Sequence, residues 1–198
     1  MGVTISDLTL LGVVLCGGRS LRMGRDKADL IAPDGRSYLD LACQRLAELC
    51  PAVCLSAATP RESPHPTLVD PPDSHGPISG ILMALEHARL HRFAGCLINP
   101  VDTPDLAVHD LQTLIDTHRC HPDNIVCAIA EPDASYLEPL IAIYPIQSAP
   151  SLRAAIERGQ FGLQRYLRDR DIVPVPLGAA ACRNVNSPTD LTPPSINE

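Results

Sequence analysis

The amino-acid sequence predicts an α/β fold built on a mostly parallel sheet. Two observations lead to this fold class. Apolar runs of strand length alternate with segments whose apolar residues recur at helical spacing, and the first apolar run ends abruptly in paired glycines. The 198 residues suffice for one sizeable core. We expect a single domain over residues 1–191 and a polar, proline-rich, disordered tail over residues 192–198.

The first half of the chain alternates four strand-like runs with two helices. Ser37 stands where it can cap the first helix, and Pro51 follows the end of that helix. Residues 59–77 carry six prolines, so we expect a long crossover that is stiffened by their fixed φ angles. The strands are expected at residues 10–15, 52–56, 67–69 and 95–101, and the helices at residues 38–49 and 78–90.

The second half of the chain continues the alternation. An amphipathic helix precedes two more strands, and two short helices follow them. Two short extended pieces come before the tail. The long helix is expected at residues 106–118, the strands at 124–130 and 137–144, the short helices at 150–158 and 163–168, and the extended pieces at 172–177 and 183–186.

The composition excludes several classes of function. The formal net charge is −7, aromatic residues make up 3% of the chain, and tryptophan is absent. We therefore expect no binding to nucleic acid or to an anionic membrane. No run approaches the ~20 apolar residues of a membrane span, and Asp7 interrupts any signal-peptide core. These features predict a cytoplasmic protein.

Eight cysteines raise the question of disulfides or a metal site. Several lie in apolar, strand-like runs, where cysteine behaves as a small hydrophobic residue. Cys50 and Cys54 are spaced as a ligand pair, but no second pair completes a zinc site at a familiar distance. Reduced core thiols are the favoured interpretation, and a metal site is the alternative.

The segment from Gly12 to Lys27 indicates a phosphate-binding loop, because glycines expose backbone amides beside several cations. It is not a Walker A loop, since five residues separate Gly18 from Gly24 and Arg25 follows. The dinucleotide fingerprint is also absent, because Gly17 and Gly18 are adjacent. The polar side chains that could hold phosphate oxygens are Arg19, Ser20, Arg22 and Lys27.

Two aspartates stand at the ends of expected strands. Asp102 follows the central apolar run, where carboxylates of open α/β sheets can hold Mg²⁺, although an Asx turn that opens the next helix is the alternative. Asp70 precedes Pro71 and could accept hydrogen bonds from a base or a ribose, although ordinary Asp-Pro turn chemistry remains open.

Residues 15–27 resemble the signature of the Rossmann-like nucleotidyltransferases, and within them that of the molybdenum cofactor guanylyltransferases, the MobA-like family. The family's usual form is Leu-Ala-Gly-Gly-x-Ser-x-Arg-Met-Gly-x-Asp-Lys, from which this chain departs at Cys16. Further strings match the family in order, up to Asp190. They are His75-Gly76-Pro77-Ile78-Ser79-Gly80-Ile81, Val101-Asp102-Thr103-Pro104, Glu138-Pro139-Leu140 to Tyr144, and Asn184-Val185-Asn186-Ser187-Pro188-Thr189-Asp190.

The resemblance implies a three-layer α/β/α nucleotidyltransferase fold with a mostly parallel sheet. It also implies transfer of GMP from GTP to the terminal phosphate of molybdopterin or of the molybdenum cofactor, with Mg²⁺ as cofactor. Molybdoenzymes or their chaperones would be the partners that receive the product. The implied catalytic residues are Lys27, Arg22 and Asp102, with Asp102 as metal ligand. The implied nucleotide-binding residues are Leu15, Cys16, Gly17, Gly18, Arg19, Ser20, Lys27, Ser56, Asp70 and Asp102. The implied acceptor-binding residues are Gly76, Pro77, Gly80, Asn184 and Asn186.

The chain departs from the family pattern at two further places. Ser56 stands where the family often has Asn, and residues 159–165 lack the usual Arg-Ser or Lys-Ser pair, with Arg165 as the nearby cation. Guanine is expected as the base because Gly17-Gly18 resembles the guanine-using members, whereas related cytidylyltransferases have Ala-Gly there. The alternatives are a cytidylyl- or sugar-phosphate nucleotidylyltransferase of the same fold and a non-catalytic carrier of molybdopterin or nucleotide.

Overall fold

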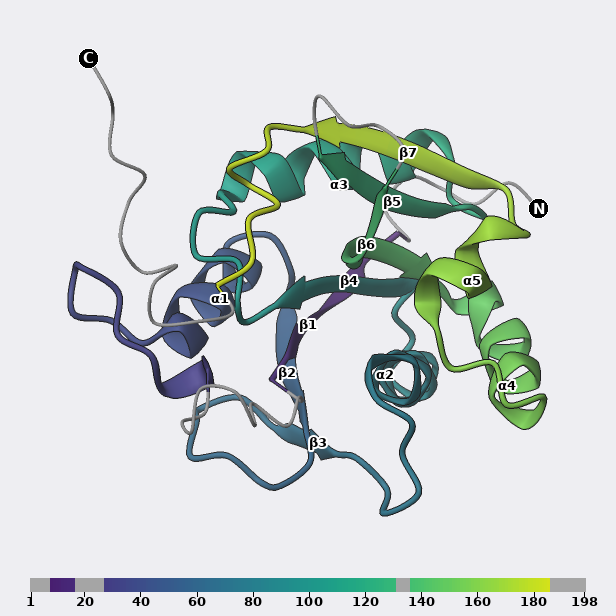
Figure 1. Ribbon diagram of the computed structural model, residues 1–198, viewed down its shortest axis with the longest axis horizontal. Coiled ribbons are helices and arrows are strands. Elements are labelled where there is room, and N and C mark those ends of the chain that lie inside the picture. Colours follow the sequence, from purple (N-terminus) through teal and green to yellow (C-terminus); the bar gives the residue numbers. More distant parts are fainter. Residues whose placement is uncertain (1–7, 17–26, 131–135, 186–198) are drawn as a thin grey trace.

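The computed structural model describes residues 8–16, 27–130 and 136–185. Within these ranges the strands form one seven-stranded sheet in the order β3-β2-β1-β4-β6-β5-β7 (Figure 1). The strands are β1 (Leu10–Leu15), β2 (Ala52–Ala57), β3 (Thr67–Val69), β4 (Gly95–Pro100), β5 (Ile125–Ala130), β6 (Leu137–Pro145) and β7 (Ile172–Leu177).

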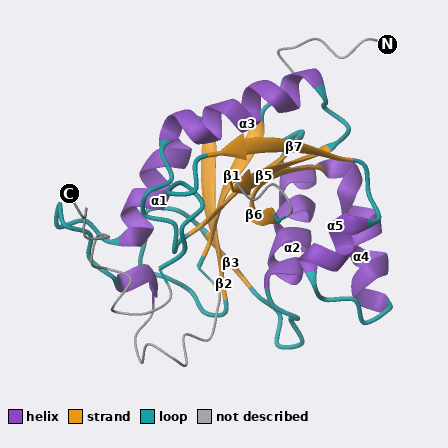
Figure 2. Cartoon of the chain, turned by 45° about the horizontal axis from the view of Figure 1, so that its top comes forward, coloured by secondary structure: helices purple, strands orange, loops and turns teal. Residues whose placement is uncertain are grey.

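Helices cover both faces of the sheet, as Figure 2 shows in purple against the orange strands. One hydrophobic core packs α1 and α3 on one face, and a second core packs α2, α4 and α5 on the other. The three-layer α/β/α prediction is therefore confirmed. The helices are α1 (Tyr38–Ala47), α2 (Pro77–Leu90), α3 (Val108–Cys120), α4 (Ala149–Glu157) and α5 (Leu163–Arg168), with short 3₁₀ turns η2 (Lys27–Asp29) and η3 (Ile146–Ser148).

The sheet is mostly parallel, as expected, but β6 runs against its neighbours. β1 pairs in parallel with β2 and β4, β2 with β3, and β5 with β7, whereas β6 is antiparallel to both β4 and β5. The connection from β5 to β6, residues 131–136, is much shorter than a parallel crossover needs. The chain must therefore return antiparallel, which brings the start of β6 to the carboxyl end of β4.

Three expected elements differ from the structure by more than one residue. The first helix ends at Ala47 rather than at residue 49, because the amides of Leu49 and Cys50 turn back to the carbonyl of Leu46. The helix expected at residues 106–118 begins at Val108, where the Asp110 carboxylate accepts a hydrogen bond from the Ala107 amide. The expected extended piece at 183–186 is a loop through Val185, and residue 186 and the expected tail lie outside the described residues.

All eight cysteines are free thiols, and seven are buried. Burial raises the pKa of Cys43 and of Cys182 to about 11, and that of Cys50, Cys54 and Cys127 to about 12. These thiols are therefore protonated and serve as core packing. In the described part of the chain, no helix has the length and apolar character that a membrane crossing requires.

His118 on α3 makes the stability of the fold depend on pH. Its side chain is 1% exposed, and neither ring nitrogen has a hydrogen-bond partner among the described residues. Burial lowers the pKa of His118 below its ordinary value of 6.5, against an opposing effect of the Asp123 charge. The unfolded chain therefore binds a proton at a higher pH than the folded chain does. The stability contributed by neutral His118 is complete above about pH 6.5 and is lost as the pH falls through the folded pKa.

We expect His118→Leu to flatten that part of the stability profile and to raise stability at every pH, because the buried ring nitrogens are removed. Urea unfolding of both proteins between about pH 5 and pH 8 measures the difference in slope. Equal slopes for the two proteins below pH 6.5 would contradict the assignment.

Candidate functional site

Four parallel strand ends lie side by side at one edge of the sheet, because β3, β2, β1 and β4 are neighbours in that order. Backbone hydrogen bonds continue past the strands at this carboxyl edge. The Cys16 amide donates to the Ser56 carbonyl over 2.9 Å, the Asp70 amide to the Ala57 carbonyl over 2.9 Å, and the Val101 amide to the Leu15 carbonyl over 3.2 Å. The sheet thus brings together Leu15, Cys16, Ser56, Asp70 and Asp102, as the sequence predicts for ligand sites in such sheets.

A cavity of about 630 Å³ opens between the ends of β1, β2 and β3 and the start of α2. Its lining includes three residues predicted to bind nucleotide and three predicted to bind the acceptor. One cavity wall therefore combines residues that were predicted to bind two different substrates. The six residues are Leu15, Ser56, Asp70, Gly76, Pro77 and Gly80.

Ser56 and Asp70 form the polar wall of this cavity. The buried Ser56 hydroxyl donates a hydrogen bond to Asp70 Oδ1 over 3.3 Å. Partial burial raises the pKa of Asp70 above its ordinary value, and the bond from Ser56 acts in the opposite direction. The Ser56 hydroxyl also fills the space beside Gly80, where a Cβ would lie 2.5 Å from it. A glycine at position 80 therefore lets α2 approach β2 while Ser56 keeps its bond to Asp70.

The first turn of α2 faces the same cavity. Gly76 has a φ of 74°, a conformation that glycine adopts without strain, and Pro77 opens the helix. The amides of this turn give the cavity a partial positive charge. His75 lies outside the cavity lining, with its ring stacked on Phe161 at 3.8 Å between centroids. The structure therefore gives His75 a packing role at this position.

Cys16 contributes to the edge through its backbone. Its side chain is buried in the core on the α1 face, and the thiol lies 3.6 Å from the Val14 carbonyl oxygen. Leu15 points to the opposite face, where it lines the cavity. Contacts from Cys16 to a ligand would therefore come from its main chain.

Asp102 is not among the residues that line the cavity. It follows the end of β4, and the antiparallel start of β6, which carries Glu138, lies at the same edge of the sheet. Burial raises the pKa of Glu138, and the negative charge of Asp102 raises it further. Glu138 belongs to a string that resembles the family, but no function was predicted for it from the sequence. The signal that could have found it was the short β5–β6 connection, which requires the antiparallel return.

The segment before residue 186 is held against the loop that carries Asp102. The Val185 amide donates to the Asp102 carbonyl over 2.8 Å, and Arg183 Nη2 forms an ion pair with Asp105 Oδ2 at 2.7 Å. Asn184 lies between these two anchors with an exposed side chain. The structure thus places Asn184, predicted as an acceptor residue, beside Asp102 and away from Gly76, Pro77 and Gly80.

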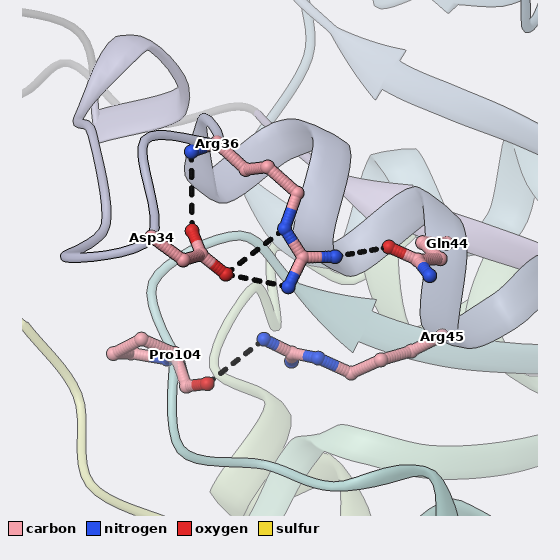
Figure 3. A network of polar contacts seen from close by, with 5 residues as sticks. All are labelled: Asp34, Arg36, Gln44, Arg45 and Pro104. Carbon is pink, nitrogen blue, oxygen red and sulfur yellow. Dashed lines mark hydrogen bonds and ion pairs between the residues drawn. The ribbon is translucent and has the colours of Figure 1, made fainter.

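Arg45 on α1 is hydrogen-bonded to the same loop (Figure 3). Its guanidinium donates from Nη1 to the Thr103 carbonyl and from Nη2 to the Pro104 carbonyl, each over 2.9 Å. The side chain is 9% exposed, and burial lowers the pKa of Arg45. Figure 3 also shows that nearby Arg36 instead pairs with Asp34 and Gln44 at the surface. Sequence reasoning missed Arg45, although it falls on the apolar face of its helix, three residues after Ala42.

Several predicted residues cannot be placed relative to this site. Gly17, Gly18, Arg19, Ser20, Arg22 and Asn186 lie outside the described residues, and of Lys27 the structure describes only the backbone, at the start of η2.

The donor set at the end of β4 suits a hard divalent cation. At this edge Asp102 offers carboxylate oxygens and the neighbouring Asn184 an amide oxygen, which are the ligand types that Mg²⁺ prefers. In the described ranges, no three His, Cys, Asp or Glu side chains gather as a complete metal cage. A cation here would therefore need additional oxygen ligands from water or from nucleotide phosphates.

The chain is similar to known proteins in sequence and in fold. Residues 12–174 match the family model of the MobA-like NTP transferase domain. A protein named probable molybdenum cofactor guanylyltransferase from Rhodopirellula baltica is 40% identical over 193 residues, which cover 93% of this chain and 91% of the relative.

Solved structures show the same fold. The molybdopterin-guanine dinucleotide biosynthesis protein A of Archaeoglobus fulgidus matches with a TM-score of 0.74 at 21% identity, covering 92% of this chain and 95% of that one. A Mycobacterium tuberculosis protein, solved as a complex with manganese, matches with a TM-score of 0.57 at 18% identity, covering 86% and 88%.

Proposed function

The chain belongs to the MobA-like NTP transferase family, and on that premise we propose that it transfers GMP from GTP to the terminal phosphate of molybdopterin or of the molybdenum cofactor. The observation that carries this function is the 40% identity, over nearly the whole length, to a relative named for guanylyl transfer. The cavity supports it, because Leu15, which lines the cavity, stands two positions before the paired glycines that would help to hold a triphosphate.

The guanosine part of GTP would occupy the cavity between β1, β2, β3 and α2. The Asp70 carboxylate can accept hydrogen bonds from guanine N–H groups or ribose hydroxyls, with Ser56 holding it in place. The amides at the start of α2 and the pair Gly17-Gly18 would face the nucleotide with their backbones. Because Gly76, Pro77 and Gly80 line this cavity, we propose that they contact the nucleotide rather than the acceptor, for which the sequence predicted them.

In the chemical step the terminal phosphate of molybdopterin attacks the α-phosphorus of GTP. A new P–O bond forms, the bond to the bridging oxygen breaks, and pyrophosphate leaves with the bonding electron pair. An ionised phosphate is already a nucleophile, so the protein needs to supply no general base. Arg19, Ser20 and Arg22 would hold the β- and γ-phosphates, and Lys27 would neutralise charge as the bridging oxygen departs.

Asp102 and the amide of Asn184 would hold a divalent cation where the two phosphates meet. When bound, Mg²⁺ would neutralise the charge on the α-phosphate and on the phosphate of the acceptor. The loop that Arg45 anchors would keep the Asp102 carboxylate in position to hold the cation. Asn184 and Asn186 remain the residues that we propose for the acceptor side, and a molybdoenzyme or its chaperone in the cytoplasm would receive the product.

Pyrophosphate release from GTP and, separately, from CTP tests this function. The assay contains the purified full chain, Mg²⁺ and molybdopterin. We expect pyrophosphate release with GTP and none with CTP. Turnover with CTP alone would keep the fold and the reaction but would contradict the role of Gly17-Gly18 in base choice. Binding of GTP without any pyrophosphate release would favour a non-catalytic carrier.

A further inference from the structure

The loop between β3 and α2 separates the cavity described above from a second hollow. Residues 71–76 of this loop, called the outer wall here, line the cavity of about 630 Å³ through Pro71, Pro72, Ser74 and Gly76. The outer wall also lines a groove of about 430 Å³, whose other side is formed by residues of α2 and α4. Because both of its faces meet open space, core packing alone cannot fix the position of the outer wall.

Hydrogen bonds give the outer wall local support. The Ser74 amide donates to the Pro71 carbonyl over 2.9 Å and closes a turn. The His75 amide donates to the Ser79 hydroxyl over 2.9 Å and joins the wall to the first turn of α2. Both bonds connect residues that are near neighbours in the chain. They shape the wall, but they do not tie it to a distant part of the fold.

A ring contact supplies that distant support. The His75 ring stacks on the ring of Phe161, with centroids 3.8 Å apart and planes inclined by 19°. Phe161 lies far along the chain, in the connection between α4 and α5. Its side chain is 39% exposed, so the ring lies at the surface against the outer wall. Stacked rings attract each other beyond the area that they bury.

The connection that carries Phe161 is itself anchored. Gly159, with a φ of 71°, turns the chain at the end of α4. Two positions after Phe161, Leu163 is buried in the core on the α2 face. The Ser151 hydroxyl of α4 lies 2.7 Å from the Tyr166 hydroxyl of α5, which links the two helices. Phe161 is therefore presented to the outer wall from a fixed support.

From this geometry we propose that Phe161 is a positioning residue for the nucleotide. Through His75 it holds the outer wall where guanosine requires it. The inference rests on the proposed function, which puts guanosine in the cavity. Neither ring lines the cavity, so neither is expected to touch the nucleotide itself. The support acts on binding, which the substrate and the transition state share, and leaves the chemical step unchanged.

Calorimetric titration of the full chain with α,β-methylene GTP and Mg²⁺ tests the inference. We expect Phe161→Leu to weaken binding roughly 2- to 10-fold, the range that one aromatic pair provides. Phe161→Tyr should bind as tightly as the wild type, because it keeps the ring. In steady-state assays of Phe161→Leu, KM for GTP should rise by the same factor while kcat stays unchanged.

A double variant tests whether Phe161 acts through His75. His75→Ala should weaken binding of the analogue by a factor similar to that of Phe161→Leu. The two changes together should weaken it no further, because either one already removes the stack. Losses that multiply in the double variant would show that the two residues act separately, and would contradict the inference.

Leu90→Ala is the matched control. Leu90 is a large apolar residue, 72% exposed, at the far end of α2 from the outer wall. Its replacement should leave the affinity for the analogue unchanged. Thermal unfolding of each variant separates positioning from stability, because a merely structural residue would lower the melting temperature and leave the affinity of the folded protein unchanged.

The inference is wrong if Phe161→Leu binds the analogue as tightly as the wild type, or if the wild type binds no analogue. A lowered kcat with unchanged affinity would also contradict it. The fate of the proposed function is read separately, from GTP-dependent pyrophosphate release by the wild type. If that assay showed no turnover while binding of the analogue depended on Phe161, the transfer reaction would be contradicted and the positioning role would stand.

Discussion

Asp102→Asn is expected to lower kcat for GMP transfer roughly 10²- to 10³-fold, the loss typical of removing one charge-stabilising group from a reacting centre. The amide has nearly the same shape as the carboxylate, so the loop that the Val185 amide and Arg45 anchor should keep its position. Affinity for GTP should change little, because the cavity that would hold guanosine is lined by other residues. The effect should therefore appear in kcat, through loss of the divalent cation that Asp102 would hold near the α-phosphate.

Pyrophosphate release under saturating GTP measures kcat, and calorimetric titration with α,β-methylene GTP measures nucleotide affinity. Asp116→Asn is a suitable control, since Asp116 is an exposed carboxylate on α3 that pairs with Arg119. A near-normal kcat in Asp102→Asn would contradict the cation role. A large loss of GTP affinity with unchanged kcat would place Asp102 on the nucleotide rather than on the reacting phosphates.

The sequence predicted the fold class because strand and helix periods are local signals. The buried runs at residues 10–15 and 95–100 and the apolar face of α1 are visible in the amino-acid order alone. The direction of β6 could not be read from such local patterns, because it depends on the length of the connection between β5 and β6. The extended piece expected at 183–186 joins no strand over its described residues, 183–185, for a related reason: the Val185 amide bonds to the Asp102 carbonyl rather than to a neighbouring strand.

The candidate site was predictable where it depends on strand ends. Asp102 follows from the rule that ligands collect at the carboxyl edge of a parallel sheet. The family resemblance implied Leu15, Ser56 and Asp70, which lie at the ends of neighbouring strands at the same edge. Arg45 was not predicted as a site residue, because it acts on a loop that is distant in sequence. Arg45 lies 58 positions from Thr103, and only the packing of α1 against the end of β4 brings them together.

The two carbonyls that Arg45 holds are the reason to expect a large effect from Arg45→Met. Methionine fills much of the space of the arginine stem but leaves the carbonyls of Thr103 and Pro104 without their donor. Hydrogen bonds from a charged group contribute about 1.5–3 kcal/mol each, so we expect the free energy of unfolding to fall by about 3 kcal/mol. Because residues 103 and 104 directly follow Asp102, kcat should also fall, with a smaller change in GTP affinity.

Urea unfolding measures the stability change, and Arg36→Met is the matched control. Arg36 precedes the same helix, but its pair with Asp34 is exposed to solvent. Exposed ion pairs contribute about 0–1 kcal/mol, so the control should lose no more than about 1 kcal/mol. If both variants lost the same small amount, the Arg45 clamp would not stabilise the loop. Arg45→Met could instead lose stability while its kcat stayed normal below its melting temperature. In that case Arg45 would stabilise the fold without positioning Asp102 for the reaction.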